Sequence, residues 1–148
     1  MLLPEIVVSV KIKNKSAERH TINCSQHAYN YAMQIFNADT IEWTEEFIML
    51  CLNRRNRLVS YYKVASGGTA GVLVDPKIIF TIALNSGAHS IIVAHNHPSG
   101  ELDPSDEDKR ITQKIKAGGE VLDVKLLDHL ICTPNGFFSF ADEGLIFN

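Results

Sequence analysis

Apolar and polar positions in the first half of the chain repeat with the spacings of strands and helices. Residues 5–13 alternate between apolar and polar side chains, which is the period of a strand with one face on a core. Ser25 can act as an N-cap, and apolar residues after it recur every three or four positions through Phe36, which predicts a helix of about three turns. Residues 45–62 run apolar, polar, apolar around a turn at 53–56, so we expect a hairpin there.

The second half carries the signals of further helices and strands. They are a helix starting at Asp75-Pro76 and ending near 85–87, a buried strand at 90–94, a helix from beyond Pro104 to Gly118-Gly119, and a hairpin of 121–132 with 137–140. Residues 66–69 are predicted to form a loop. Since the chain shows no internal repeat and no long linker, we expect one domain over residues 1–148. Its predicted class is α/β, with a mixed central sheet flanked by helices.

Composition and charge narrow the function classes. With 148 residues, 45% of them hydrophobic, the chain has enough apolar mass for a core, and disorder is excluded. The net charge of −3 predicts no general attraction to nucleic acid or anionic lipid, and the concentrated basic patch is Arg54-Arg55-x-Arg57. No apolar run approaches the roughly 20 residues of a membrane span, and the N-terminus resembles no signal peptide. We therefore expect a cytoplasmic protein without a membrane partner.

The cysteines are not predicted to do chemistry. Cys24, Cys51 and Cys132 are an odd number, widely spaced and without a C-x-x-C pair, which argues against a disulfide framework and against a thiolate zinc site. Cys51 lies in an apolar run and reads as a small buried hydrophobic residue. We expect reduced thiols without a catalytic role.

The stretch that follows the predicted buried strand holds the candidate chemistry. His95 and His97 are two residues apart, so on a strand their imidazoles project from one face and could bind one metal ion. Asp108 is the natural third ligand, because the loop after Pro98 can bring the next helix back over the strand end. Two histidines and one carboxylate leave a position open for water, as in catalytic zinc sites. The plainer alternatives are two polar residues at a strand end and a capping box formed by Ser105 and Asp108.

These residues match a known metal motif. The run from His95 to Asp108 fits H-x-H-P-x(6)-S-x-x-D, the motif of the JAMM or MPN-plus metallopeptidases, and its H-N-H-P-S-G opening resembles the bacterial RadC-type JAB domain. The family has similar blocks at Gly68-Thr69, 75–80, 128–131 and 139–145, and often has arginine where Lys77 stands. The resemblance runs from about residue 40 to the end of the chain. It implies a curved mixed sheet flanked by helices, the JAB/MPN or cytidine-deaminase-like architecture.

The resemblance also implies a mechanism. One Zn²⁺ per chain would be held by His95, His97 and Asp108, and would activate water to attack a peptide or isopeptide amide bond of a protein or peptide substrate. Glu45 would be the general base and would later protonate the leaving amine. Ser105 would hydrogen-bond the developing oxyanion.

The position of the general base depends on the resemblance alone. Glu46 stands next to Glu45, and on a strand the two would point to opposite faces, so the choice between them matters. For either residue, the plain interpretation is a solvated charge at a strand start. His20, His27 and His89 are expected to be surface or structural residues, and Asp128-His129 is interpreted as a buried hydrogen-bonded pair.

Two other functions compete with hydrolysis. RadC-like proteins carry a DNA-repair label, and relatives commonly have an N-terminal helix-hairpin-helix module, for which this chain has no room. The letters His95-Asn96-His97 do not indicate an HNH nuclease, whose residues are dispersed over a longer unit, so nucleic acid is not the partner that we expect. The second alternative is a non-catalytic MPN interaction module, although every position of the metal motif is filled here.

Overall fold

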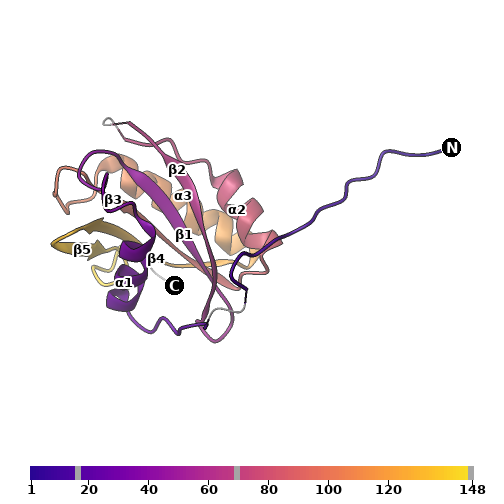
Figure 1. The fold of residues 1–148 in the computed structure, drawn as a ribbon, viewed down its shortest axis with the longest axis horizontal. Helices are drawn as coiled ribbons and strands as arrows, with labels where there is room; N and C mark the ends of the chain where they lie inside the picture. Colours follow the sequence, from indigo (N-terminus) through magenta and orange to yellow (C-terminus); the bar gives the residue numbers. More distant parts are fainter. Residues whose placement is uncertain (16–17, 69–70, 147–148) are drawn as a thin grey trace.

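The computed structural model describes residues 1–15, 18–68 and 71–146 (Figure 1). Over these residues it contains three helices and one five-stranded sheet. In chain order the elements are α1 (Ser25–Ile35), β1 (Glu46–Leu52), β2 (Leu58–Ser66), α2 (Pro76–Asn85), β3 (Ser90–Asn96), α3 (Asp106–Leu122), β4 (Lys125–Thr133) and β5 (Gly136–Ser139).

The sheet is mixed, with the strand order β2-β1-β3-β4-β5. β1 pairs antiparallel with both β2 and β3, β3 and β4 run parallel, and β5 is antiparallel to β4. A parallel pair needs a crossover connection, which α3 supplies between β3 and β4. A mixed sheet with flanking helices confirms the predicted α/β class and agrees with the architecture that the resemblance implies.

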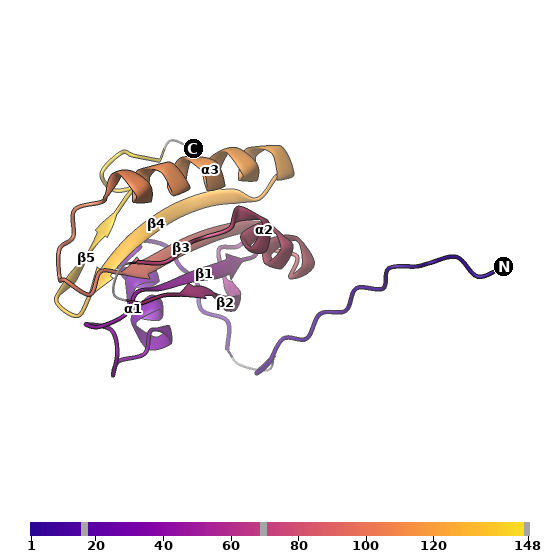
Figure 2. The ribbon, with the colours of Figure 1, turned by 90° about the horizontal axis from the view of Figure 1, so that it is seen from above.

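Helices cover both faces of the sheet, so the central strands are enclosed. Successive strand residues point to opposite faces. The odd-numbered residues of β1 pack in a core with α2 and α3, and the even-numbered residues pack in a second core with α1. Figure 2 shows α3 and α1 on opposite sides of the sheet. Every residue of β1 and β3 is buried, which explains the continuous apolar runs in their sequences.

Most predicted elements are confirmed. The first helix, the hairpin of β1 and β2, the buried strand β3 and the final hairpin of β4 and β5 are all present. Two of their starts differ from the prediction: Cys24, and not Ser25, is the N-cap of α1, and β4 begins at Lys125 because residues 121 and 122 still belong to α3. The side chain of Asp75 accepts a hydrogen bond from the backbone N–H of Lys77 at 2.9 Å, which caps α2 as predicted. Of the predicted loop 66–69, Ser66 is instead the last residue of β2, and Thr69 lies outside the described residues.

The predicted N-terminal strand is wrong. Residues 1–11 are exposed and carry no strand, and they extend away from the sheet (Figures 1 and 2). The side chain of Ile6 is 91% exposed and that of Val8 is 65% exposed. An alternating pattern defines a face but supplies no partner strand. Residues 20–22 instead lie beside the first residues of β2, on the edge that faces away from β1. There the N–H of Leu58 donates to the carbonyl of His20.

The predicted end of the third helix is also wrong. α3 runs through Gly118 and Gly119 to Leu122, and its C-cap is Asp123 in the left-handed conformation, with φ of 55°. The glycines serve close packing. A Cβ on Gly119 would lie 2.2 Å from the carbonyl oxygen of Val124, and one on Gly118 would lie 2.6 Å from the ring of Phe80 in α2. They therefore let α3 approach its neighbours, and they do not end it.

The remaining general expectations concern thiols and membranes. The cysteines are free thiols, with Cys51 and Cys132 buried and Cys24 exposed. In the described part of the chain, no helix has the length and hydropathy needed to cross a membrane.

Candidate metal centre

Three separate segments bring four potential metal-binding side chains together at one end of the sheet. β3 supplies His95 and continues into His97, Glu45 directly precedes β1, and Asp108 lies in the first turn of α3. Phe47 pairs with His95 across β1 and β3, so Glu45 lies beside the end of β3 and on the same face. One ligand atom from each of the four lies within 4.8 Å of the others, and we call this group the cluster.

Distances within the cluster are short. His95 Nε2 lies 3.0 Å from His97 Nε2 and 3.2 Å from Asp108 Oδ1. Asp108 Oδ2 lies 3.2 Å from His97 Nε2, and Glu45 Oε1 lies 3.5 Å from His95 Nε2. Ligand atoms about 2.0–2.1 Å from a tetrahedral zinc ion are separated by about 3.3–3.4 Å. The spacing of the nitrogen and carboxylate atoms therefore suits one such ion.

The hydrogen bond on the far side of His97 favours a cation in the cluster. His97 Nδ1 lies 2.7 Å from the carbonyl oxygen of Glu101, and a carbonyl only accepts, so Nδ1–H donates. In the neutral ring, Nε2 then carries a lone pair that faces the carboxylate of Asp108. Two acceptors at this distance repel unless a proton or a metal ion lies between them. Imidazole nitrogen and carboxylate oxygen are common ligand atoms of zinc in proteins.

The pKa values show how strongly the cluster groups interact. Burial raises the pKa of Asp108, but the close imidazole rings of His95 and His97 outweigh burial and hold that pKa well below its usual range. The hydrogen bond to Asp108 raises the pKa of His97 above its usual value of 6.5. Burial raises the pKa of Glu45, while attraction to His95 lowers it. In the absence of metal, Asp108 is therefore ionised and attracts a proton to His97.

A capping box holds Asp108 in place. The backbone N–H of Asp108 donates to Ser105 Oγ at 3.0 Å, and the backbone N–H of Ser105 donates to Asp108 Oδ2 at 2.9 Å. This arrangement satisfies two backbone donors at the start of α3. The capping and ligand interpretations of Asp108 are thus compatible. Ser105 itself is exposed beside the cluster.

Two buried residues behind His95 connect it to α3. His95 Nδ1 lies 2.8 Å from His129 Nε2, and His129 Nδ1 lies 2.6 Å from Thr112 Oγ1. His129 and Thr112 are both 0% exposed, and burial lowers the pKa of His129 well below its usual value. Sequence reasoning missed Thr112, since a threonine within a helix carries no signal of its own. The spacing of Asp108 and Thr112, one helical turn apart, is the only hint.

Asp128 and His129 are both buried, but their side chains do not bond to each other. Asp128 Oδ1 accepts the backbone N–H of His129, at 2.7 Å, and also that of Ala141. Asp128 Oδ2 accepts the hydroxyl of Ser139 at 2.6 Å. The interpretation as a pair therefore holds only through the backbone: Asp128 secures the turn after β5, and His129 belongs to the surroundings of His95.

The polar residues on the α1 face make structural contacts. Glu46 Oε1 accepts the backbone N–H of Asn37, and Glu46 Oε2 lies 3.2 Å from Lys63 Nζ. Asn96 Oδ1 accepts the backbone N–H of Glu46, and Asn96 Nδ2 donates to the carbonyls of Ile41 and Thr44. Glu46 is thus occupied away from the cluster, as expected from the alternation of a strand.

The cluster borders a small cavity of about 40 Å³. Its walls are formed by Glu45, Phe47, Val72, Val74, His95, Glu107, Asp108 and Ile111. This volume exceeds the roughly 10–15 Å³ that one water molecule needs. There is therefore room for water beside the cluster, between Glu45 on one side and Asp108 on the other.

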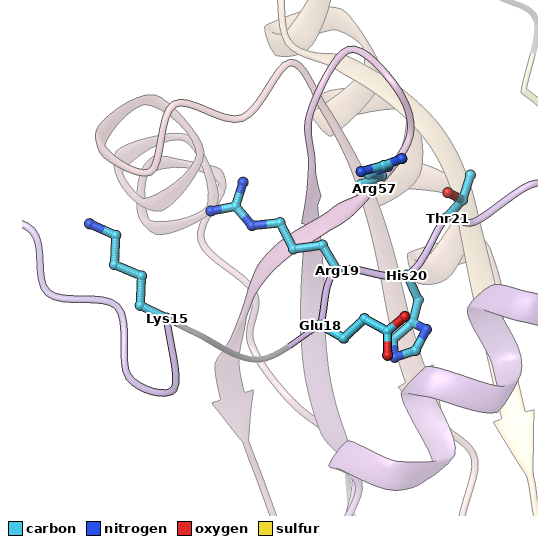
Figure 3. Close-up of a pocket in the computed structure, with 6 residues that line it drawn as sticks. All are labelled: Lys15, Glu18, Arg19, His20, Thr21 and Arg57. Carbon is cyan, nitrogen blue, oxygen red and sulfur yellow. The ribbon is translucent and has the colours of Figure 1, made fainter.

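A larger hollow of about 700 Å³ lies at the opposite end of β1, against the hairpin turn (Figure 3). It is lined by Lys15, Glu18, Arg19, His20, Thr21 and Arg57. None of the cluster residues takes part in it. His20 and His89 are exposed and His27 is half-buried, and all three lie outside the cluster.

Fold and cluster together define a JAB-type domain with a potential metal site. Residues 22–145 match the family described as RadC-like JAB domain. The chain belongs to this family, as the motif from His95 to Asp108 implies.

Three similar proteins carry only a family name. A UPF0758 protein of Flavobacterium johnsoniae is 52% identical over 101 residues, which cover 68% of this chain and 44% of the relative. UPF0758 proteins of Aquifex aeolicus and Coprothermobacter proteolyticus are 39% and 35% identical, over 86% and 91% of this chain and 54% and 58% of the relatives. The chain spans about half the length of the curated relatives it matches, and their names state no activity.

Proposed function

We propose that this chain is a zinc-dependent hydrolase of the JAMM type that cleaves a peptide or isopeptide amide bond. The observation that carries the proposal is the convergence of His95 Nε2, His97 Nε2 and the Asp108 carboxylate at 3.0–3.2 Å. Membership in the RadC-like JAB domain family supports the same site. A cytoplasmic location belongs to the proposal and is supported by the free thiols.

His95, His97 and Asp108 are the residues that would hold the ion, and the water-sized cavity beside them would hold the attacking water. When bound, Zn²⁺ would act as a Lewis acid and would lower the pKa of water toward neutrality. The capping box keeps the carboxylate of Asp108 fixed relative to β3, so this ligand needs no reorganisation.

Glu45 is the group that we assign to proton transfer. Its carboxylate lies 3.5 Å from His95 Nε2 and forms one wall of the cavity, so it can take a proton from water placed there. The same carboxyl group would then give the proton to the leaving amine. Glu46 is unsuited to this role, because its two carboxylate oxygens contact Asn37 and Lys63 on the other face.

Ser105 is assigned to the oxyanion that develops on the attacked carbonyl. Its oxygen accepts the N–H of Asp108, and its hydroxyl proton can donate toward the substrate. Removing an oxyanion donor typically costs about 2.7–4 kcal/mol of transition-state stabilisation. Ser105→Ala also removes the cap, so its effect on turnover must be compared with its effect on unfolding.

The test is the metal content of protein purified without added metal or chelator, measured by inductively coupled plasma mass spectrometry. We expect near-stoichiometric zinc in the wild type and none in His97→Ala. His89→Ala is the matched control, because His89 is exposed and lies outside the cluster. A wild type that stays metal-free after zinc is added would contradict the proposal and favour a non-catalytic interaction module. Zinc-loaded protein would then be screened against peptide and isopeptide libraries.

A nucleic-acid contact is the second candidate, favoured by one observation. Lys15, Arg19 and Arg57 line the hollow at the hairpin turn, and Glu18 in the same lining points toward His20 (Figure 3). Cationic side chains of this kind bind phosphates without reading sequence. If this hollow binds DNA, Arg19→Ala combined with Arg57→Ala should weaken binding and reduce its dependence on salt. DNA binding that the double variant leaves unchanged would exclude the hollow.

A further inference from the structure

The inference concerns the two buried residues behind His95 and rests on the proposed function. His95, His129 and Thr112 come from β3, β4 and α3, and they are 1%, 0% and 0% exposed. Their polar atoms are joined by contacts of 2.8 and 2.6 Å. In addition, the Thr112 hydroxyl lies 2.6 Å from the carbonyl oxygen of Asp108, one helical turn earlier. These contacts form a continuous chain from one cluster residue to another.

The direction of each hydrogen bond follows from the last acceptor. The carbonyl of Asp108 can only accept, so the single hydroxyl proton of Thr112 is donated to it. Thr112 Oγ1 can then only accept from His129, which requires a proton on His129 Nδ1. Burial favours the neutral ring of His129, so its Nε2 carries a lone pair.

The same reasoning reaches His95. Because His129 Nε2 is an acceptor, His95 Nδ1 must be the protonated atom between the two rings. In the neutral ring this leaves the lone pair of His95 on Nε2, the atom that lies 3.0 Å from His97 Nε2 and 3.2 Å from Asp108 Oδ1. The buried chain thus selects the tautomer of His95 that can bind a metal ion.

We propose that Thr112 and His129 are positioning residues that hold His95 in its Nδ1–H tautomer, with the Nε2 lone pair directed into the cluster. Without the Thr112 hydroxyl, His129 could carry its proton on Nε2 and donate to His95 Nδ1. The proton of His95 would then sit on Nε2 and block the metal position. Outer partners of metal-binding histidines typically change metal affinity by about 10- to 100-fold when they are removed.

Thr112→Val tests the proposal, because it removes the hydroxyl while nearly preserving side-chain shape. Thr112→Ser is its matched control, since serine keeps the hydroxyl. Zinc affinity is measured by competition with a chromophoric chelator. We expect about 10- to 100-fold weaker binding in Thr112→Val and recovery in Thr112→Ser. Thermal unfolding of the metal-free variants checks that both are folded.

A second measurement reads the tautomers directly. Long-range ¹H–¹⁵N correlation spectra of metal-free protein at alkaline pH distinguish protonated from unprotonated ring nitrogens. In the wild type, we expect the proton of His129 and that of His95 on Nδ1. In Thr112→Val, His129 should shift toward the Nε2–H form. A loss of packing alone would not move a proton between ring nitrogens, so this signature separates positioning from structural support.

The outcomes separate this inference from the proposed function. A wild type with the His129 proton on Nε2, or a Thr112→Val variant that binds zinc as tightly as the wild type, would overturn the inference and leave the proposed function intact. A wild type that binds no zinc would overturn the proposed function instead. In that case the tautomers of the metal-free protein still confirm or refute the hydrogen-bond chain.

Discussion

His95 and Asn96 are neighbours on β3, yet they face opposite sides of the sheet and meet opposite surroundings. On the α1 face, the amide of Asn96 makes three hydrogen bonds, each between a donor and an acceptor. On the α2 and α3 face, His95 Nε2 meets His97 Nε2 and the carboxylate of Asp108. Both sets are polar and enclosed. Around Asn96 every donor meets an acceptor of the same chain, whereas around His95 Nε2 the neighbouring atoms are themselves acceptors.

The difference separates polar groups that hold a fold together from groups arranged to bind something. A buried amide with all its partners stabilises one backbone arrangement. In contrast, acceptors that converge on acceptors leave a place for a cation, and they cost stability when that place is empty. Four predictions break or sharpen this comparison, in order of decreasing effect.

The largest effect is expected from Asp108→Ala, which removes a carboxylate from the cluster. We expect zinc content to fall from near-stoichiometric to undetectable, as measured by mass spectrometry of the purified protein. Asp106→Ala is the matched control, because Asp106 is also acidic and in the first turn of α3 but lies outside the cluster. Equal zinc loss in both variants would show that helix-terminal charge, and not ligation, is responsible.

The adjacent glutamates provide the second prediction. Glu45→Gln should retain zinc but lower kcat by about 10²- to 10⁴-fold, the usual contribution of a general base. Glu46→Gln should retain both zinc and turnover, and should lower the free energy of unfolding by about 1 kcal/mol or less, because the lost partner Lys63 is half-exposed and glutamine keeps an oxygen for the N–H of Asn37. Initial rates on a cleaved substrate and urea titration measure the two effects. Similar rates for the two variants would refute the assignment of Glu45.

The third prediction concerns stability on the α1 face. Asn96→Ala leaves the buried backbone N–H of Glu46 and the carbonyls of Ile41 and Thr44 without their partner. Unsatisfied buried groups cost about 1–3 kcal/mol each, so the free energy of unfolding should fall by at least that amount. Asn30→Ala on the exposed side of α1 should change it by less than about 0.5 kcal/mol. Urea titration distinguishes them, and equal values would contradict the structural role of Asn96.

The smallest effect is a pH dependence of the metal-free protein. The pKa of Asp108 is lowered by folding, so its contribution is present above the usual value of 3.8 and is lost as pH falls through the lowered pKa. The pKa of His97 is raised, so its contribution is present below 6.5 and is lost as pH rises through the raised pKa. The melting temperature of metal-free protein should therefore be highest between about pH 3.8 and pH 6.5, where both contributions are present.

With zinc present, the melting temperature should no longer fall as pH rises through the raised pKa of His97. Protons compete with the metal for His97, so the increase in melting temperature on adding zinc should grow as pH rises through the raised pKa. Thermal melts with zinc and with a chelator measure the difference. A zinc effect that is constant over this range would show that His97 does not exchange a proton for the ion.

Local patterns predicted most of the elements and much of the cluster. The spacing of His95 and His97 needs only the two-residue period of β3, and Ser105 with Asp108 needs only the first turn of a helix. Glu45 required resemblance to a family, because its approach to His95 depends on how β1 pairs with β3. Thr112 and His129 are 17 positions apart, so only the crossover through α3 brings them together.

The two wrong element predictions have one physical cause in common. The alternation around Ile6 and the glycine pair 118–119 show which local structures these segments can adopt. The segments that pack beside them decide which structure forms. No strand lies beside residues 5–13 in the described structure, and close neighbours at Val124 and Phe80 require glycine inside α3. Tertiary contacts, which no local pattern encodes, thus override the signals for a strand and for a helix end.

For a bound ion, the capping box would have a kinetic consequence. Asp108 Oδ2 accepts the N–H of Ser105 and also faces His97, so one oxygen atom belongs both to the start of α3 and to the cluster. The first turn of a helix frays faster than its centre. An ion held by Asp108 would then leave when this turn opens, and slower fraying would give a longer residence time. The opening rate of the first turn of α3 would therefore set the exchange rate of the ion.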